Sequence, residues 1–176
     1  RLIPWKGQEL LINAFHKLTL SHNNIRLLVV GGPPKGREGF SRHLKELVAK
    51  LNIKDKVEML GFMNNTSELY KKADLVVVPS LAPEPFGRVA IEAMGYGRPI
   101  VAARHGGLVE ILEDNEGGLL FKPNSTEDLV EKISLFINDE EFLSTQSIKA
   151  KARYKNRFTV SIYKDNFLRI ISAIIK

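Results

Sequence analysis

Short apolar runs rich in β-branched residues alternate along this chain with longer segments in which apolar residues recur at helical spacing. Near-continuous apolar runs at 26–31, 74–78 and 99–103 predict buried strands, and weaker runs at 57–60 and 118–121 predict two more. Continuous apolar strands are typical of a parallel sheet whose two faces are both covered by helices.

The segments between these runs predict the covering helices. In the series Leu10, Leu11, Ala14, Phe15 and Leu18, the apolar side chains fall on one helical face. Strands that alternate with helices of this length predict a Rossmann-like α/β fold, a doubly wound parallel sheet flanked by helices. Ligands bind such a sheet at the edge where the carboxyl ends of the strands meet. Further helices are expected near 44–51, 66–72, 87–96, 125–136, 140–155 and 160–175.

The composition narrows the classes of function. The 176 residues are enough for one domain with a full core, and the absence of Cys excludes disulfides, thiolate metal ligands and cysteine nucleophiles. The formal net charge of +6 fits either solubility with a basic tail or attraction to an anionic partner. The late basic run lacks the glycine and the interleaved aromatics of an RNA-binding strand, so no nucleic acid partner is expected. This run comprises Lys149, Lys151, Arg153, Lys155 and Arg157, and the lysines near the end of the chain are interpreted as helix surface.

The ends and hydropathy of the chain bear on its location. No apolar run is long enough to span a bilayer and no signal peptide is recognised, so we expect a cytoplasmic protein. Because the chain opens abruptly at Arg1 without an initiator Met, we interpret it as a fragment of a longer protein.

The most informative segment is 83–94, Pro-Glu-Pro-Phe-Gly-Arg-Val-Ala-Ile-Glu-Ala-Met, directly after the predicted strand at 74–78. Its two prolines and glycine predict a sharp loop, and a helix then begins near Gly87. The first turn of that helix would lie at the functional edge of the sheet. Free backbone N–H groups and the helix dipole make such a position a natural phosphate site.

Two carboxylates belong to this segment. The helix has little polar face, so we expect it to be buried on most sides and Glu92 to need a partner. One interpretation is an i,i+4 ion pair with Arg88, and the other is a bidentate acceptor for vicinal hydroxyls such as those of ribose. Glu84 lies in the loop and is expected to project over the same pocket but further out, unless it is an exposed loop acid.

Glu84 and Glu92, with the residues around them, resemble the E-x7-E motif of retaining glycosyltransferases with the GT-B fold (glycosyltransferase group 1, family 4). The resemblance covers essentially the whole chain. It implies that residues 1–176 are the C-terminal, donor-binding domain, one half of a two-domain GT-B enzyme whose N-terminal acceptor domain lies outside this chain. It also implies that the apolar residues of the last helix, such as Phe167 and Ile171, lean on that other domain. The alternative is that they complete the core of this one.

The resemblance assigns roles to individual residues. Arg1 and Lys6 match the pair that holds the donor diphosphate, and their side chains suit phosphate chemically. Glu84 would hold the donor sugar and Glu92 the ribose, without a covalent sugar–enzyme intermediate. The remaining donor-site positions are Phe86, Gly87, Arg88, Val89, Gly31, Gly32, Phe62, Met63, Gly106 and Gly107.

Some of these positions also have plainer interpretations. The pair Gly31-Gly32 fits an ordinary strand-to-loop turn, Phe62 fits a core residue, and Gly106-Gly107 fits a helix start. We interpret His105 as a turn histidine rather than a catalytic base. No role is therefore assigned to it.

The implied reaction is transfer of a sugar, with retained configuration, from a UDP-, GDP- or ADP-sugar to a saccharide or lipid-linked acceptor. No Asp-x-Asp metal motif is present, so neither a metal nor another cofactor is expected. The isolated fragment would be inactive. The full enzyme would be able to contact the inner face of a membrane as a peripheral protein. A non-catalytic nucleotide-binding or regulatory module remains the alternative. An NAD-type domain would need G-x-G-x-x-G after the first strand, where this chain has Gly31-Gly32-Pro33-Pro34.

Overall fold

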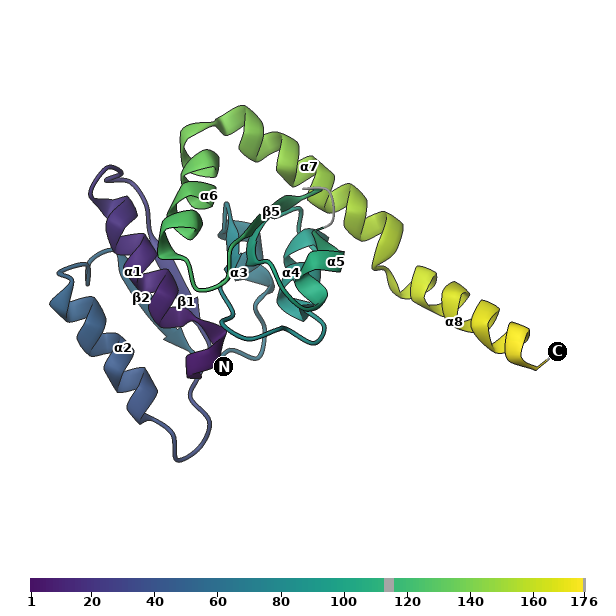
Figure 1. Ribbon diagram of the computed structural model, residues 1–176, viewed down its shortest axis with the longest axis horizontal. Helices are drawn as coiled ribbons and strands as arrows, with labels where there is room; N and C mark the ends of the chain where they lie inside the picture. Colours follow the sequence, from purple (N-terminus) through teal and green to yellow (C-terminus); the bar gives the residue numbers. More distant parts are fainter. Residues whose placement is uncertain (113–115, 176) are drawn as a thin grey trace.

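The computed structural model describes residues 1–112 and 116–175 and consists of short parallel strands that alternate with helices (Figure 1). The strands are β1 (Leu27–Val30), β2 (Val57–Gly61), β3 (Val76–Val78), β4 (Ile100–Ala103) and β5 (Gly118–Phe121). The helices are the 3₁₀ turn η1 (Pro4–Lys6), α1 (Gln8–Thr19), α2 (Gly39–Lys50), α3 (Ser67–Lys72), α4 (Arg88–Gly95), α5 (Gly107–Ile111), α6 (Thr126–Asn138), α7 (Glu140–Arg157) and α8 (Val160–Ile174). The predicted alternation of strands and helices is confirmed.

All paired strands are parallel, as the apolar runs predicted. Hydrogen bonds join them as a two-stranded sheet, β1-β2, and a three-stranded sheet, β3-β4-β5, rather than as one continuous sheet. Parallel pairing places the carboxyl ends of paired strands at the same edge, which sets the position of the loops that follow them.

Strand β4 lies at the centre of the larger sheet and is buried along its whole length. Val101 and Ala103 pack with residues of α1 and α6, whereas Ile100 and Ala102 pack with residues of α4, α5 and α7. This sheet is therefore doubly wound, with helices on both faces. In the smaller sheet, Val29 and Val57 pack with residues of α1 and α2.

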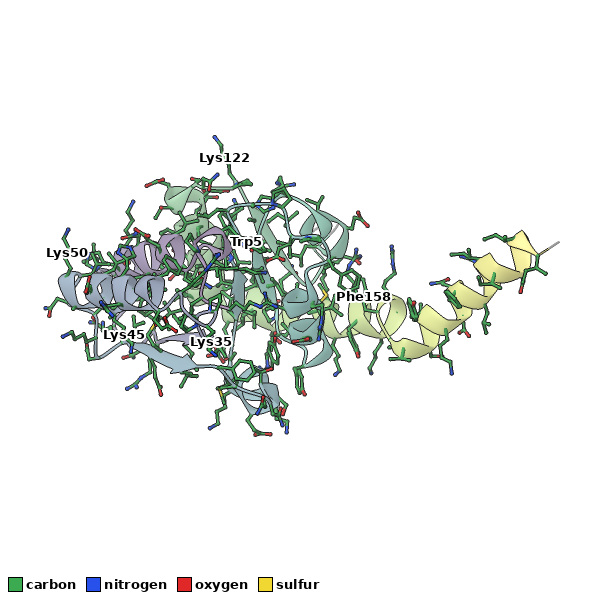
Figure 2. The ribbon with its side chains drawn as sticks, turned by 90° about the horizontal axis from the view of Figure 1, so that it is seen from below. Trp5, Lys35, Lys45, Lys50, Lys122 and Phe158 are labelled. Carbon is green, nitrogen blue, oxygen red and sulfur yellow. The ribbon has the colours of Figure 1, made fainter. Side chains whose placement is uncertain are left out.

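The last two helices differ in how they pack. Helix α7 contacts α4 and α6, and its Arg153 is buried and donates hydrogen bonds to the backbone oxygens of Ile111 and Glu110. Its guanidinium caps the end of α5, so this member of the late basic run belongs to the packed interior. Helix α8 has no buried residue and extends away from the other elements (Figures 1 and 2).

The exposure of α8 excludes one of the two interpretations of its apolar residues. Phe167 and Ile171 do not complete the core. Their side chains are exposed and belong neither to the buried groups on the two faces of the larger sheet nor to the buried group of the smaller sheet. Phe158 lies where α7 ends and the projecting helix begins (Figure 2), and it is the last residue packed against the core. Within the described residues, no helix is both long and apolar enough to cross a membrane.

Candidate functional site

The site is assembled at the carboxyl ends of the strands, beginning with the turn that carries Lys6. Gly7 follows η1 with a φ of 73°, and its backbone lies so close to Pro79 that a Cβ would overlap the Pro79 carbonyl oxygen. Leu81 N–H donates to the Trp5 carbonyl oxygen at 2.7 Å, which joins η1 to the loop after β3. Because Gly7 has no side chain, η1 can approach Pro79 closely, and Lys6 therefore lies at the edge of the larger sheet.

Lys6 meets Glu84 there. The Lys6 ammonium donates to Oε1 of Glu84 and also lies 4.4 Å from the centroid of the Trp5 ring. Ser80 Oγ, itself buried, donates to the same Oε1 at 2.6 Å. The described residues give Oε2 of Glu84 no hydrogen bond, so that oxygen remains free to accept hydroxyls.

The loop that carries Glu84 is tied to the loop before α5. Glu84 and Gly106 form a parallel bridge, and Gly107 N–H donates to the Glu84 carbonyl oxygen at 2.8 Å. Gly106 has a φ of 59°, and a Cβ there would overlap the Glu84 backbone. The imidazole Nε2 of His105 lies 2.8 Å from the Ser80 carbonyl oxygen, which fits its interpretation as a turn histidine.

Helix α4 starts beside these loops. Gly87, with a φ of 81°, precedes it, and no side chain caps the helix. A Cβ on Gly87 would lie 2.8 Å from Ile111 Cδ1, so glycine lets α4 pack closely on α5. Phe86 and Val89 are exposed around this helix start. Uncapped N–H groups and the helix dipole suit an anion.

Glu92 lies one turn into α4. Tyr70 Oη donates to its Oε2 at 3.1 Å, and Arg88 Nη2 donates to its Oε1 at 3.3 Å. The Glu92 side chain is 41% exposed and borders an open depression of about 530 Å³ between α3, α4 and the end of α7. The predicted ion pair with Arg88 is present, yet it leaves the carboxylate accessible.

The relative burial of the two acids was predicted wrongly. Glu84, expected further out, is only 6% exposed, whereas Glu92, expected to be buried, is partly exposed. The reason is that the loop bridge folds Glu84 under Lys6, while Glu92 occupies the outer side of α4.

The smaller sheet contributes the remaining predicted residues. Gly31 N–H donates to the Gly61 carbonyl oxygen at 2.8 Å, and a Cβ on Gly31 would lie 3.0 Å from the backbone nitrogen of Arg1. Arg1 therefore lies against the turn after β1. Phe62 is 77% exposed, which excludes the core interpretation, and Met63 beside it is also exposed.

Two residues at these contacts were not predicted from the sequence. Ser80 follows β3 and could have been found as a small polar residue at the end of a buried strand. Tyr70 carries no local signal, because only the packing of α3 beside α4 brings it to Glu92. Among residues 1–112 and 116–175, no group of His, Cys, Asp and Glu could hold a metal ion.

Comparison with protein families and known proteins identifies relatives. Residues 1–154 match the family described as "Glycosyl transferases group 1". An uncharacterized glycosyltransferase of Methanocaldococcus jannaschii is 34% identical over 174 residues, which cover 93% of this chain and 43% of that protein. A D-inositol 3-phosphate glycosyltransferase of Mycobacteroides abscessus is 38% identical over 135 residues, 76% of this chain and 29% of that protein.

Solved structures agree with these sequence matches. The Anabaena HepE protein in complex with UDP superposes with a TM-score of 0.92 and 34% identity, covering 98% of this chain and 47% of that one. The same protein in complex with UDP-glucose gives a TM-score of 0.90. The chain thus spans less than half the length of these relatives.

Proposed function

Because this chain belongs to the glycosyl transferases group 1 family, we propose that it is the donor-binding half of an enzyme that transfers a sugar with retained configuration. The donor is a nucleoside-diphosphate sugar, and the E-x7-E pair Glu84 and Glu92 supports the retaining class. The acceptor is a saccharide or a lipid-linked saccharide, bound by a second, N-terminal domain.

The observation that carries the proposal is the meeting of Lys6 and Glu84 beside the uncapped start of α4. A cation and free backbone N–H groups gather where an anion would bind, and an acceptor oxygen of Glu84 stays free beside them. This combination suits a ligand that joins a phosphate to a polyhydroxylated group.

The chemistry follows from where charge develops. The transition state resembles an oxocarbenium ion and the departing diphosphate gains negative charge. Lys6, Arg1 and the first turn of α4 stabilise that charge. Glu84 holds hydroxyls of the donor sugar through Oε2, and Glu92 accepts hydrogen bonds from the ribose diol. Glu84 is not assigned as a nucleophile.

UDP is the first nucleotide to test, ahead of GDP and ADP. The relative from Anabaena, 34% identical over nearly all of this chain, is described in complex with UDP and with UDP-glucose. The turn formed by Phe62 and Met63 would border the base. The enzyme is proposed to work in the cytoplasm, with the option of contact with the inner face of a membrane.

The exposed apolar face of helix α8 favours the proposal of a second domain. Its apolar side chains, including Tyr163, Phe167 and Ile174, are exposed in the described chain, and apolar surface of this extent usually marks an interface. Since the relatives are more than twice as long as this chain, the proposed N-terminal domain is the natural partner for α8.

Calorimetry with UDP, GDP and ADP tests the proposal directly. The 176-residue chain is expected to bind UDP weakly and to transfer no sugar from a UDP-sugar. The full-length enzyme should transfer the sugar, and the anomeric configuration of the product should be that of the donor by NMR. Absence of measurable binding to all three nucleotides would overturn the assignment.

A further inference from the structure

Tyr70 lies at the depression beside α4 and contacts one of the proposed donor-binding residues from another element. It belongs to α3, whereas Glu92 belongs to α4, and the hydroxyl-to-carboxylate distance is 3.1 Å. The depression has other polar and aromatic walls, among them Asn64, Asn65, Tyr96, Tyr154 and Phe158.

We propose that Tyr70 is a positioning residue that fixes the Glu92 carboxylate in the orientation that accepts the hydroxyls of the donor ribose. This inference rests on the proposed function, because it takes the ribose as the ligand of Glu92. It adds a second residue, from a separate helix, to the recognition of the nucleotide.

The Tyr70 ring is held on two sides, which makes its hydroxyl a fixed donor. It stacks on Tyr96 with ring centroids 5.4 Å apart and planes 15° from parallel. It also packs against the buried group that β4 forms with α4, α5 and α7. The end of α3 is fastened in turn, because Arg98 Nη2 donates to the Lys71 carbonyl oxygen at 2.7 Å.

The other donor to Glu92 is less constrained. Arg88 is 81% exposed and reaches Oε1 at 3.3 Å through a flexible side chain, and exposed i,i+4 pairs of this kind are weak. Tyr70 has only two side-chain torsions and is partly buried. Of the two donors, Tyr70 therefore determines the orientation of the carboxylate, while Arg88 can move when a ligand arrives.

The protonation of the Tyr70 hydroxyl suits this role. Burial and the negative charge of Glu92 raise the pKa of the Tyr70 hydroxyl above its ordinary value. The hydroxyl therefore remains a proton donor at neutral pH. Each carboxylate oxygen accepts more than one hydrogen bond, so Oε2 can accept from Tyr70 and from a ribose hydroxyl together.

The test compares UDP with 2′,3′-dideoxy-UDP, which has no ribose hydroxyls, by calorimetry on the 176-residue chain. The wild-type chain should bind UDP more tightly, and the ratio of the two dissociation constants measures hydroxyl recognition. Tyr70→Phe should weaken UDP binding about three- to tenfold and leave dideoxy-UDP binding unchanged. Tyr96→Leu, which removes the stacking partner, should reduce the ratio by a smaller factor.

The matched control is Tyr163→Phe, which removes a tyrosine hydroxyl from the exposed helix α8, away from the depression, and it should leave the ratio at its wild-type value. An unchanged ratio in Tyr70→Phe overturns the positioning role, whether both affinities persist or both fall by the same factor. In either case the proposed function stands if Glu92→Gln still abolishes the discrimination. If the wild-type chain fails to discriminate between the ligands, the ribose role of Glu92 fails, and the positioning role with it.

Discussion

The Lys6 ammonium donates to a carboxylate oxygen of Glu84, a residue 78 positions away in the chain. The contact joins the turn before α1 to the loop after β3 and places opposite charges where a diphosphate sugar is proposed to bind. The proposed ligand therefore meets a cation that already has an anionic partner.

Glu84→Gln separates the two proposed roles of this pair. The change removes a negative charge beside the diphosphate and frees Lys6, so affinity of the chain for UDP should rise about two- to tenfold. Sugar transfer by the full-length enzyme should fall about a hundredfold, because the donor sugar loses its ionised acceptor. Calorimetry and a transfer assay measure the two effects.

The control for this change is Glu127→Gln. Glu127 forms a similar pair with Lys17, at 2.7 Å, on the exposed surface of α6 and α1. Its replacement should leave both measurements unchanged. Weaker UDP binding in Glu84→Gln would contradict a position for the diphosphate beside Lys6.

Glu92→Ala should weaken binding of UDP to the chain about a hundredfold, to the affinity of 2′,3′-dideoxy-UDP. Two hydrogen bonds from hydroxyls to an ionised carboxylate are worth about 3 kcal/mol together, which corresponds to a factor of this size. Calorimetry makes the comparison, with Glu46→Ala as the control because Glu46 is an exposed helical glutamate on α2. UDP binding of unchanged affinity in Glu92→Ala would disprove the ribose role.

Gly7→Ala should destabilise the chain by about 2–4 kcal/mol, because alanine is strained at a φ of 73° and its Cβ would overlap the Pro79 carbonyl oxygen. Urea denaturation provides the measurement. Gly39→Ala is the matched control, since a Cβ there meets no atom within 4 Å and the residue begins a helix. Equal stability of the two variants would mean that η1 is not held against the larger sheet.

Removing apolar bulk from α8 should cost the isolated chain little. The double variant Phe167→Ser and Ile171→Ser should change the free energy of unfolding by less than about 0.5 kcal/mol, since no residue of α8 is buried. Leu129→Ala in the core should cost about 2–5 kcal/mol in the same denaturation experiment. A comparable loss from the double variant would show that α8 packs on this domain.

The sequence predicts the elements of this fold well, because local periodicity determines them. The apolar run at 99–103 becomes β4, and Ser125, the first residue of the helix expected at 125–136, caps α6 by accepting from Asp128 N–H. The burial of Glu84 was not predictable, since it depends on a bridge to Gly106, 22 positions later in the printed sequence.

The contacts of Glu92 illustrate the same limit. Its partner Arg88 is one helical turn away and follows from spacing alone. Its partner Tyr70 lies on another helix and depends on how α3 packs beside α4. Contacts within an element can be read from a sequence, whereas contacts between elements require the folded chain.

The bridge between Glu84 and Gly106 has a consequence for attempts to redesign donor choice. Because the two loops share backbone hydrogen bonds, with Gly107 N–H bound to the Glu84 carbonyl oxygen, neither can be transplanted from a relative without changing the other. A chimaera that exchanges 83–88 alone would import a loop shaped for a different neighbour. The unit of exchange is the pair of segments, 83–88 together with 105–107.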